Sequence, residues 1–252
     1  MLVAGGLAAA AQTSGPSHAT SPAAVPVVVE LFTSEGCSSC PPADAWLIDL
    51  ATHNYVPQAS IITLSEHVDY WDHDGWRDPF SSASFTARQN AYVQRAVGVE
   101  AATPQMIVDG TAIFIGSDRR AAIDAITKAA ATPKAPMSLS WAAAATPTVT
   151  IVVPASPLTA KASVTVAITE DGLRSNVLRG ENAGRTIAHA SVTRRLSDVG
   201  HTSADGSFKL DLPVKLDSSW NRQALRLVAF VQGSTRRVVA AGSLRMADAP
   251  AR

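Results

Sequence analysis

The two cysteines constrain the fold of this chain more than any other feature. Cys37 and Cys40 are the only cysteines among 252 residues, and they form a Cys-Ser-Ser-Cys pair that two prolines follow at once. A β-branched run over residues 25–34 ends just before the pair, and a helical apolar pattern covers residues 41–54. Proline is tolerated in the first helical turn, because the N–H there has no intrahelical partner. The sequence predicts a buried strand, then Cys37 at a helix N-terminus, with Cys40 one turn inside the helix.

The rest of the first half continues the alternation of strands and helices. The Asp-Gly pair at 109–110 predicts a hairpin turn. We expect strands and helices in the order β-α-β-α-β-β-α, with the later elements at 59–67, 83–97, 105–108, 112–115 and 118–130. This order is typical of an α/β domain, which we place at residues 25–132.

The second half has a different pattern. Pro133 and Pro136 mark a linker, and after it come alternating apolar runs separated by turn residues. Four of these runs predict strands, at 148–153, 162–168, 208–214 and 225–232. We therefore predict a second, antiparallel β-rich and sandwich-like domain over residues 137–246.

Charge and hydropathy limit the classes of function. The formal net charge is zero, which argues against a nucleic-acid partner. Residues 1–135 carry a net charge of −6 and residues 136–252 a net charge of +6. This difference has two possible explanations: the two domains attract each other electrostatically, or surface composition varies by chance along the chain. No apolar run reaches the roughly 18 residues of a membrane span.

The first 24 residues resemble a secretory signal peptide followed by a spacer. A short apolar run precedes a segment rich in alanine, serine and proline. No lysine or arginine occurs before Arg77, so the usual basic start is missing, and we expect the true start site to lie upstream. We predict a periplasmic or secreted protein, in a compartment where a disulfide persists.

The spacing of the cysteines leaves two main uses for them. A disulfide that closes so short a loop stabilises little, and a zinc site needs further ligands that the neighbouring sequence does not supply. Redox exchange and binding of a soft metal such as Cu(I) remain. At a helix N-terminus the thiolate is favoured, although Glu35 opposes ionisation if it lies close. Cys37 would attack a disulfide, and Cys40 would resolve the mixed disulfide.

Two other segments contain chemically useful side chains. His67 and Asp69 follow the second strand at the same sheet edge as the cysteines, so His67 could exchange protons with the thiols. Tyr70, Trp71 and Trp76 could wall this site. The alternatives are a loop that its aromatic residues hold in place, or a metal site formed by His67, Asp69, Asp72, His73 and Asp74.

The second segment is 179–189, which is dense in charged and polar side chains. Its members Arg179, Glu181, Arg185 and His189 either cover the redox pair from a hairpin or join that hairpin by salt bridges.

The chain resembles the thioredoxin fold and, more closely, an exported thioredoxin-like family known as domain of unknown function 1223. The residues that carry the resemblance are 30–44, 67–72, 75–80, 103–110 and 179–189. The resemblance implies a cis peptide bond between Thr103 and Pro104, lying against the cysteine pair. It also implies that this loop offers backbone groups to a partner, and that Pro104 helps to keep metals off the thiols.

These observations predict a thiol–disulfide oxidoreductase without a bound cofactor. Its predicted site consists of Cys37, Cys40, Thr103, Pro104 and His67, and its partner is a protein or small molecule that contributes a thiol or disulfide. Two alternatives stay open at this point. One is a Cu(I)-handling module with Cys37, Cys40 and His67 as ligands, and the other is a binding protein whose disulfide is inert.

Overall fold

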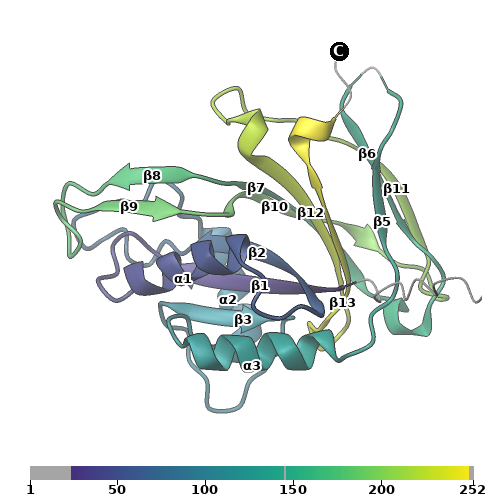
Figure 1. Ribbon diagram of the computed structural model, residues 1–252, viewed down its shortest axis with the longest axis horizontal. Coiled ribbons are helices and arrows are strands. Elements are labelled where there is room, and N and C mark those ends of the chain that lie inside the picture. The colour runs from purple at the N-terminus through teal and green to yellow at the C-terminus, as the bar shows by residue number, and fades with distance from the viewer. Residues whose placement is uncertain (1–23, 145, 250–252) are drawn as a thin grey trace, which may run out of the picture.

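One large β-sheet runs through most of the chain, and few helices pack on it (Figure 1). The structure is a computed structural model that describes residues 24–144 and 146–249. Its main sheet has eight strands in the order β13-β12-β7-β10-β2-β1-β3-β4. The protein is therefore a mixed α/β fold dominated by a sheet.

The first half forms one end of this sheet, as its sequence predicts. The strands are β1 (Val25–Thr33), β2 (Ala59–His67), β3 (Gln105–Val108) and β4 (Ala112–Ile115). β1 runs parallel to β2 and antiparallel to β3, which pairs with β4. The predicted Asp-Gly hairpin is confirmed, since both turn residues have positive φ angles of 48° and 70°.

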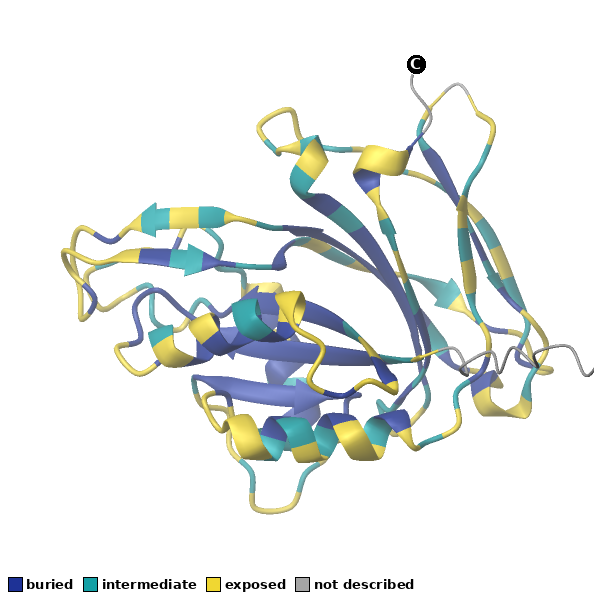
Figure 2. Ribbon diagram, in the orientation of Figure 1, coloured by how far each residue is buried: buried dark blue, intermediate teal, exposed yellow. Residues whose placement is uncertain are grey.

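Three helices cover the two faces of this end. They are α1 (Pro41–Thr52), α2 (Ala83–Val93) and α3 (Arg119–Ala130). α1 and α3 share one apolar core with Val27, Val29 and Leu31 on one face of β1. Tyr92 of α2 packs with Phe32 on the opposite face. Figure 2 shows the consequence: β1, β2 and β3 are mostly buried, and α1 and α3 keep exposed outer sides.

The second half adds strands to the same sheet and builds a small second sheet. The large sheet gains β7 (Ser163–Glu170), β10 (Val192–His201), β12 (Leu225–Gln232) and β13 (Val238–Arg245). The small sheet consists of β5 (Ser138–Trp141), β6 (Thr148–Val153) and β11 (Phe208–Pro213). The two sheets pack face to face through residues such as Ile151, Ile168 and Leu227.

A hairpin of β8 (Leu173–Asn176) and β9 (Thr186–His189) extends from the second half along α1 (Figure 1). The sequence patterns did not predict β5, β10 or β13. β10 carries polar and charged residues at most positions, and β13 contains small residues with low β-propensity.

The two halves meet inside the large sheet rather than across a gap. β10 joins β2 in parallel at the Val192–Ser65 pair. Ser65 N–H donates to the carbonyl of Ser191 at 2.8 Å, and the hydroxyls of Thr63 and Ser191 are 2.7 Å apart. The predicted regions 25–132 and 137–246 therefore share one hydrogen-bonded sheet.

No helix in the described residues is both long and apolar enough to cross a bilayer. The segment expected to be a signal peptide falls, up to residue 23, outside the described residues.

Candidate functional site

The cysteine pair lies where β1 gives way to α1. A disulfide joins Cys37 to Cys40, and both residues are fully buried. Cys40 is the N-cap residue of α1, whose first residue is Pro41. The prediction that Cys40 lies one turn inside the helix is therefore wrong: the prolines start the helix, and the carbonyl of Cys40 accepts its first bonds from Ala43 and Asp44.

The side chains between the cysteines face solvent. Ser38 and Ser39 are exposed, and the Ser39 hydroxyl lies 3.4 Å from the sulfur of Cys37. A hydroxyl at this distance can donate to a thiolate at Cys37.

The loop between β8 and β9 covers the disulfide from the other half of the chain. The side-chain amide of Asn182 donates to the carbonyls of Glu35 and Cys37, both at 2.9 Å. The backbone N–H of Ser38 donates to Glu181 at 3.0 Å, and hydrogen bonding from the Ser38 side chain and then from this N–H lowers the pKa of Glu181. Arg185 in turn donates to the Asn182 oxygen at 2.9 Å. Of the two arrangements considered for segment 179–189, the structure contains the one that covers the cysteines.

Buried acids and histidines gather beside the disulfide. We call them the acid–histidine cluster, and its members are Glu35, Asp44, His67, Asp78 and His189. All five are at most 4% exposed. Glu35 precedes Cys37 by two residues and Asp44 follows Cys40 by four, so the cluster flanks the cysteines along the chain.

Two histidine–carboxylate pairs form the centre of the cluster. His67 Nδ1 lies 2.7 Å from Asp78, and His189 Nε2 lies 3.1 Å from Glu35. The imidazole rings are 5.0 Å apart at their centroids. His67 Nε2 and His189 Nδ1 are buried with no hydrogen-bond partner in the described parts of the chain.

The environment of these groups shifts their protonation. Burial disfavours a charged His67, but the charge and hydrogen bond of Asp78 outweigh this effect and raise the pKa of His67. Burial raises the pKa of Asp78, because it disfavours the charged carboxylate as well. The charge of His67 and several hydrogen bonds outweigh burial and hold the pKa of Asp78 below its usual value. Burial raises the pKa of Asp44, which accepts a hydrogen bond from Thr33 at 2.8 Å.

The Thr103–Pro104 loop also lies at the cysteine pair. Its peptide bond is cis, as the sequence resemblance implied, and Pro104 is buried. The carbonyl of Thr103 is 3.5 Å from the Ser39 hydroxyl, and Trp71 donates its indole N–H to the Thr103 hydroxyl at 2.7 Å. The structure thus brings four of the predicted site residues, Cys37, Cys40, Thr103 and Pro104, to one place, and His67 lies in the adjoining cluster.

Other residues of the predicted loop have structural contacts. Asp69 accepts from Thr86 at 2.6 Å, and Tyr70 donates to Gln89 at 3.2 Å. Trp76 is the exception, because it donates to Glu35 at 2.8 Å. The described residues contain no group of three or more histidine, cysteine, aspartate or glutamate side chains placed to hold a metal ion. The five loop residues considered for a metal site therefore do not form one in this structure.

A sequence model of one protein family, described as a protein of unknown function (DUF1223), matches residues 28–232. The chain belongs to the DUF1223 family. This assignment confirms the sequence resemblance at the level of the family. No curated protein matches the sequence of this DUF1223 member.

Two solved structures resemble the DUF1223 fold described above. A structural-genomics crystal structure of a protein from Agrobacterium tumefaciens is 26% identical, with a TM-score of 0.72 over 91% of this chain and 98% of that chain. HBP35 of Porphyromonas gingivalis is 18% identical, with a TM-score of 0.62 over 90% of this chain and 76% of that chain, and this likeness concerns the fold alone.

Sequence reasoning missed Asp44, Asp78 and Asn182 as members of this DUF1223 site. Each lies inside a motif that carried the family resemblance, at 30–44, 75–80 and 179–189. A polar residue inside such a motif was therefore the available signal. The contacts themselves, such as that of Asn182 with Cys37 across 145 residues, depend on the tertiary fold.

Proposed function

We propose that this protein is an exported, thioredoxin-like thiol–disulfide exchange protein. The observation that carries the proposal is the Cys37–Cys40 disulfide at the start of α1, next to a buried cluster with two histidines. The sheet order β2-β1-β3-β4, with α1 and α3 on one face and α2 on the other, supports the thioredoxin-like part. The disulfide supports an oxidising location.

The exchange proceeds in two displacements that balance. In the reduced protein the thiolate of Cys37 attacks a partner disulfide, a Cys37–partner S–S bond forms, and the partner's second sulfur leaves as a thiolate. The thiolate of Cys40 then attacks the sulfur of Cys37 and releases the first partner sulfur. The partner gains two electrons and two protons, and Cys37 and Cys40 become the disulfide; the reverse sequence oxidises a dithiol.

The acid–histidine cluster suits the proton transfers of this reaction. Histidine changes its protonation near neutral pH, and the pKa of His67 is raised by Asp78. A protonated His67 gives a proton to a departing thiolate, the neutral imidazole then takes up a proton from solvent, and the Asp78 carboxylate stabilises the imidazolium that re-forms. The unpartnered nitrogens of His67 and His189 are free for such transfers.

The burial of the disulfide means that a partner must open the structure around it before it can react. Both cysteines are fully buried, so a partner sulfur reaches Cys37 only when the surrounding structure opens, and we expect the loop of Asn182, which holds the Cys37 carbonyl, to be the part that moves. A partner that binds the Thr103–Pro104 backbone and displaces the loop meets this requirement.

The test uses the full chain and glutathione. In glutathione redox buffers the wild type should exchange with a defined midpoint, and Cys40→Ser should accumulate one glutathione on Cys37, detected by mass spectrometry. Cys37→Ser serves as the matched control and should form no such adduct at a comparable rate. If Cys40→Ser reacted only after addition of denaturant, the disulfide would be a structural one and the proposal would be wrong.

A further inference from the structure

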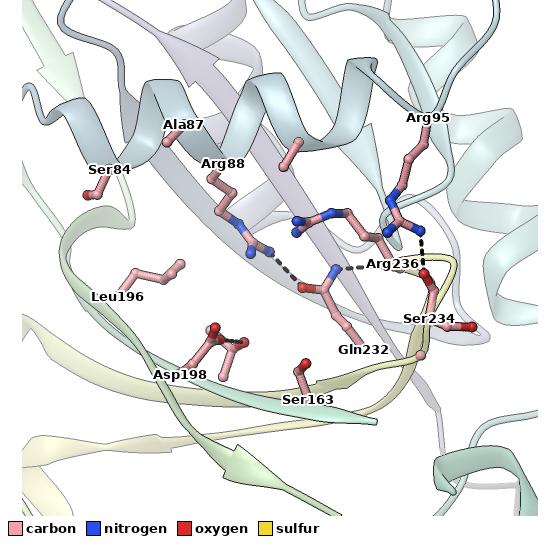
Figure 3. A pocket seen from close by; sticks show the side chains of 13 residues that line it. Ser84, Ala87, Arg88, Arg95, Ser163, Leu196, Asp198, Gln232, Ser234 and Arg236 are labelled. Atoms are coloured by element: carbon pink, nitrogen blue, oxygen red, sulfur yellow. Dashed lines mark hydrogen bonds between the residues drawn. The ribbon is translucent and has the colours of Figure 1, made fainter. Parts of the chain in front are cut away.

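A hollow of about 450 Å³ opens between α2, strands β7 and β10, and the turn that joins β12 to β13 (Figure 3). Its volume lies in the range of small-molecule sites, roughly 300 to 1,000 Å³. The lining contains no member of the acid–histidine cluster and neither cysteine. The hollow also lies where the two halves of the chain meet, which is a common position for ligand sites.

Positive charge dominates one side of the hollow. Arg88, Arg95 and Arg236 lie there with Gln232, whereas Asp198 and Ser163 lie on the opposite wall (Figure 3). Asp198 is the only carboxylate in the lining. Two or more guanidinium groups in one hollow repel one another unless an anion lies between them.

The guanidinium groups retain free donors. Arg88 uses Nε for Glu30 and Nη2 for Tyr92 and Gln232. Arg95 donates through Nη1 to the carbonyl of Ser234. No carboxylate of the described residues forms an ion pair with Arg95 or Arg236.

The conformation of Arg236 is a second, independent observation. Its Nε is buried without a hydrogen-bond partner in the described parts of the chain, and its φ angle is +65°. A non-glycine residue in this left-handed region is strained, and such strain concentrates at functional sites. The turn fixes this conformation, because the amide of Gln232 donates to the Arg236 carbonyl at 2.6 Å and the Arg236 N–H donates to Gly233 at 2.8 Å.

We propose that this hollow binds a small organic oxyanion through the guanidinium groups of Arg95 and Arg236, with Arg88 behind them. A carboxylate and a phosphate share the required chemistry, since both accept two parallel hydrogen bonds from a guanidinium group. The hydroxyl of Ser163 and the carboxylate of Asp198 on the opposite wall suit hydroxyl groups on the remainder of the ligand. The site is separate from the cysteine chemistry and does not depend on it.

The test measures binding by isothermal titration calorimetry on the full, oxidised chain. Glycerol 3-phosphate and glycerate are the probes for the two oxyanions, and glycerol is the uncharged control. We expect saturable binding of at least one probe and none of glycerol. Arg236→Gln should weaken that binding about tenfold or more, which is the factor that 1.4 kcal/mol of lost interaction produces.

Two further variants make the result interpretable. Arg237→Gln removes the same charge from the adjacent position, but Arg237 lines a different hollow beside Asp109 and α3, so its binding should equal that of the wild type. Arg236→Gly relieves the left-handed strain and should raise the melting temperature while it abolishes binding. The proposal is overturned if neither oxyanion binds, or if Arg236→Gln and Arg236→Gly bind as tightly as Arg237→Gln.

Discussion

Two buried polar clusters in this protein differ in what their charges can do. The acid–histidine cluster lies beside the disulfide. The other, which we call the arginine cluster, lies between the sheet and α2 and consists of Glu30, Glu66, Arg88, Tyr92 and Gln232. Each contains carboxylates from the first half of the chain, and each includes one side chain from the second half, His189 or Gln232.

The cation makes the difference. Arg88 keeps its charge at every physiological pH, and it bonds to Glu30 at 2.6 Å and to Tyr92 at 2.6 Å. Histidine, unlike arginine, can lose its charge at physiological pH, and His67 and His189 each leave one nitrogen unpartnered among the described residues. The arginine cluster is therefore suited to holding the two halves together, and the acid–histidine cluster to exchanging protons.

The largest effect should come from removal of the permanent cation. Arg88→Met leaves the carboxylate of Glu30 buried without a counter-ion, and we expect a loss of about 3 to 5 kcal/mol in the free energy of unfolding. Urea denaturation at pH 7.5 measures this loss. Arg77→Met, at an exposed residue without an ion pair among those described, should change stability by less than about 0.5 kcal/mol. A loss below about 1 kcal/mol for Arg88→Met would mean that the arginine cluster does not stabilise the fold.

Opening the cover over the disulfide should have the next largest effect. Asn182→Ala removes two hydrogen bonds to the cysteine loop, at a cost of about 1 to 2 kcal/mol. If the substitution lowers the free energy of local opening around the disulfide by this amount, dithiothreitol should reduce the disulfide about tenfold faster. Asn176→Ala in the same hairpin is the control, because the one side-chain hydrogen bond of Asn176 within the described residues comes from Thr186. Equal reduction rates for the two variants would show that Asn182 does not limit access.

Neutralising an acid should stabilise one cluster and not the other. Burial and the neighbouring Glu30 raise the pKa of Glu66 well above its usual value. Its folded-state pKa exceeds the unfolded one, so the wild type loses stability as the pH rises above about 4.5. Glu66→Gln should therefore be more stable than the wild type at pH 8, with the gain shrinking as the pH falls toward about 4.5.

The matched variant in the acid–histidine cluster is Glu35→Gln. Glu35 accepts one hydrogen bond from Trp76 and pairs with His189, so the substitution should give no such gain. Urea denaturation at the two pH values checks both variants. A Glu66→Gln protein that was less stable than the wild type at pH 8 would contradict the raised pKa of Glu66.

The smallest effect concerns the pH dependence that His67 contributes. Its folded-state pKa is raised, so its stabilisation is complete below pH 6.5 and is lost as the pH rises through the folded-state pKa. Asp78 has a lowered pKa, and its stabilisation is lost only as the pH falls below about 3.8. The stability difference between wild type and His67→Gln should therefore shrink between pH 6 and pH 9, by less than about 1 kcal/mol. The exposed His73→Gln should show no such trend, and a constant difference for His67→Gln would refute the His67–Asp78 coupling.

The sequence was sufficient where local patterns determine the structure. Apolar periodicity and the Asp-Gly turn predicted all seven elements of the first half, and β6 and β12 have the predicted bounds. Errors arose at ends and in polar segments: α2 ends at Val93 rather than at 97, and α1 starts after Cys40. β10 carries too many charged residues to resemble a strand on its own, and it is stabilised by its pairing with β7 and β2.

The site was predicted in part for the same reason. The cysteines, His67 and the Thr103–Pro104 loop have recognisable local contexts. The pairing of His189 with Glu35 and of Asn182 with Cys37 joins residues about 150 positions apart, and no periodicity in the sequence encodes such contacts. A hydrogen-bonding side chain inside a distinctive motif indicates that a contact exists, but only the fold identifies its partner.

The narrow junction between β2 and β10 has a consequence for how this chain can be divided. A fragment that ended near residue 132 would turn β2 into an edge strand, with peptide groups open to pairing with another molecule, and such edges promote aggregation. The same cut would leave Glu35 without its imidazole partner and the carbonyl of Cys37 without its bond from Asn182. Recombinant work on the cysteine-bearing part therefore has to carry both halves in one polypeptide.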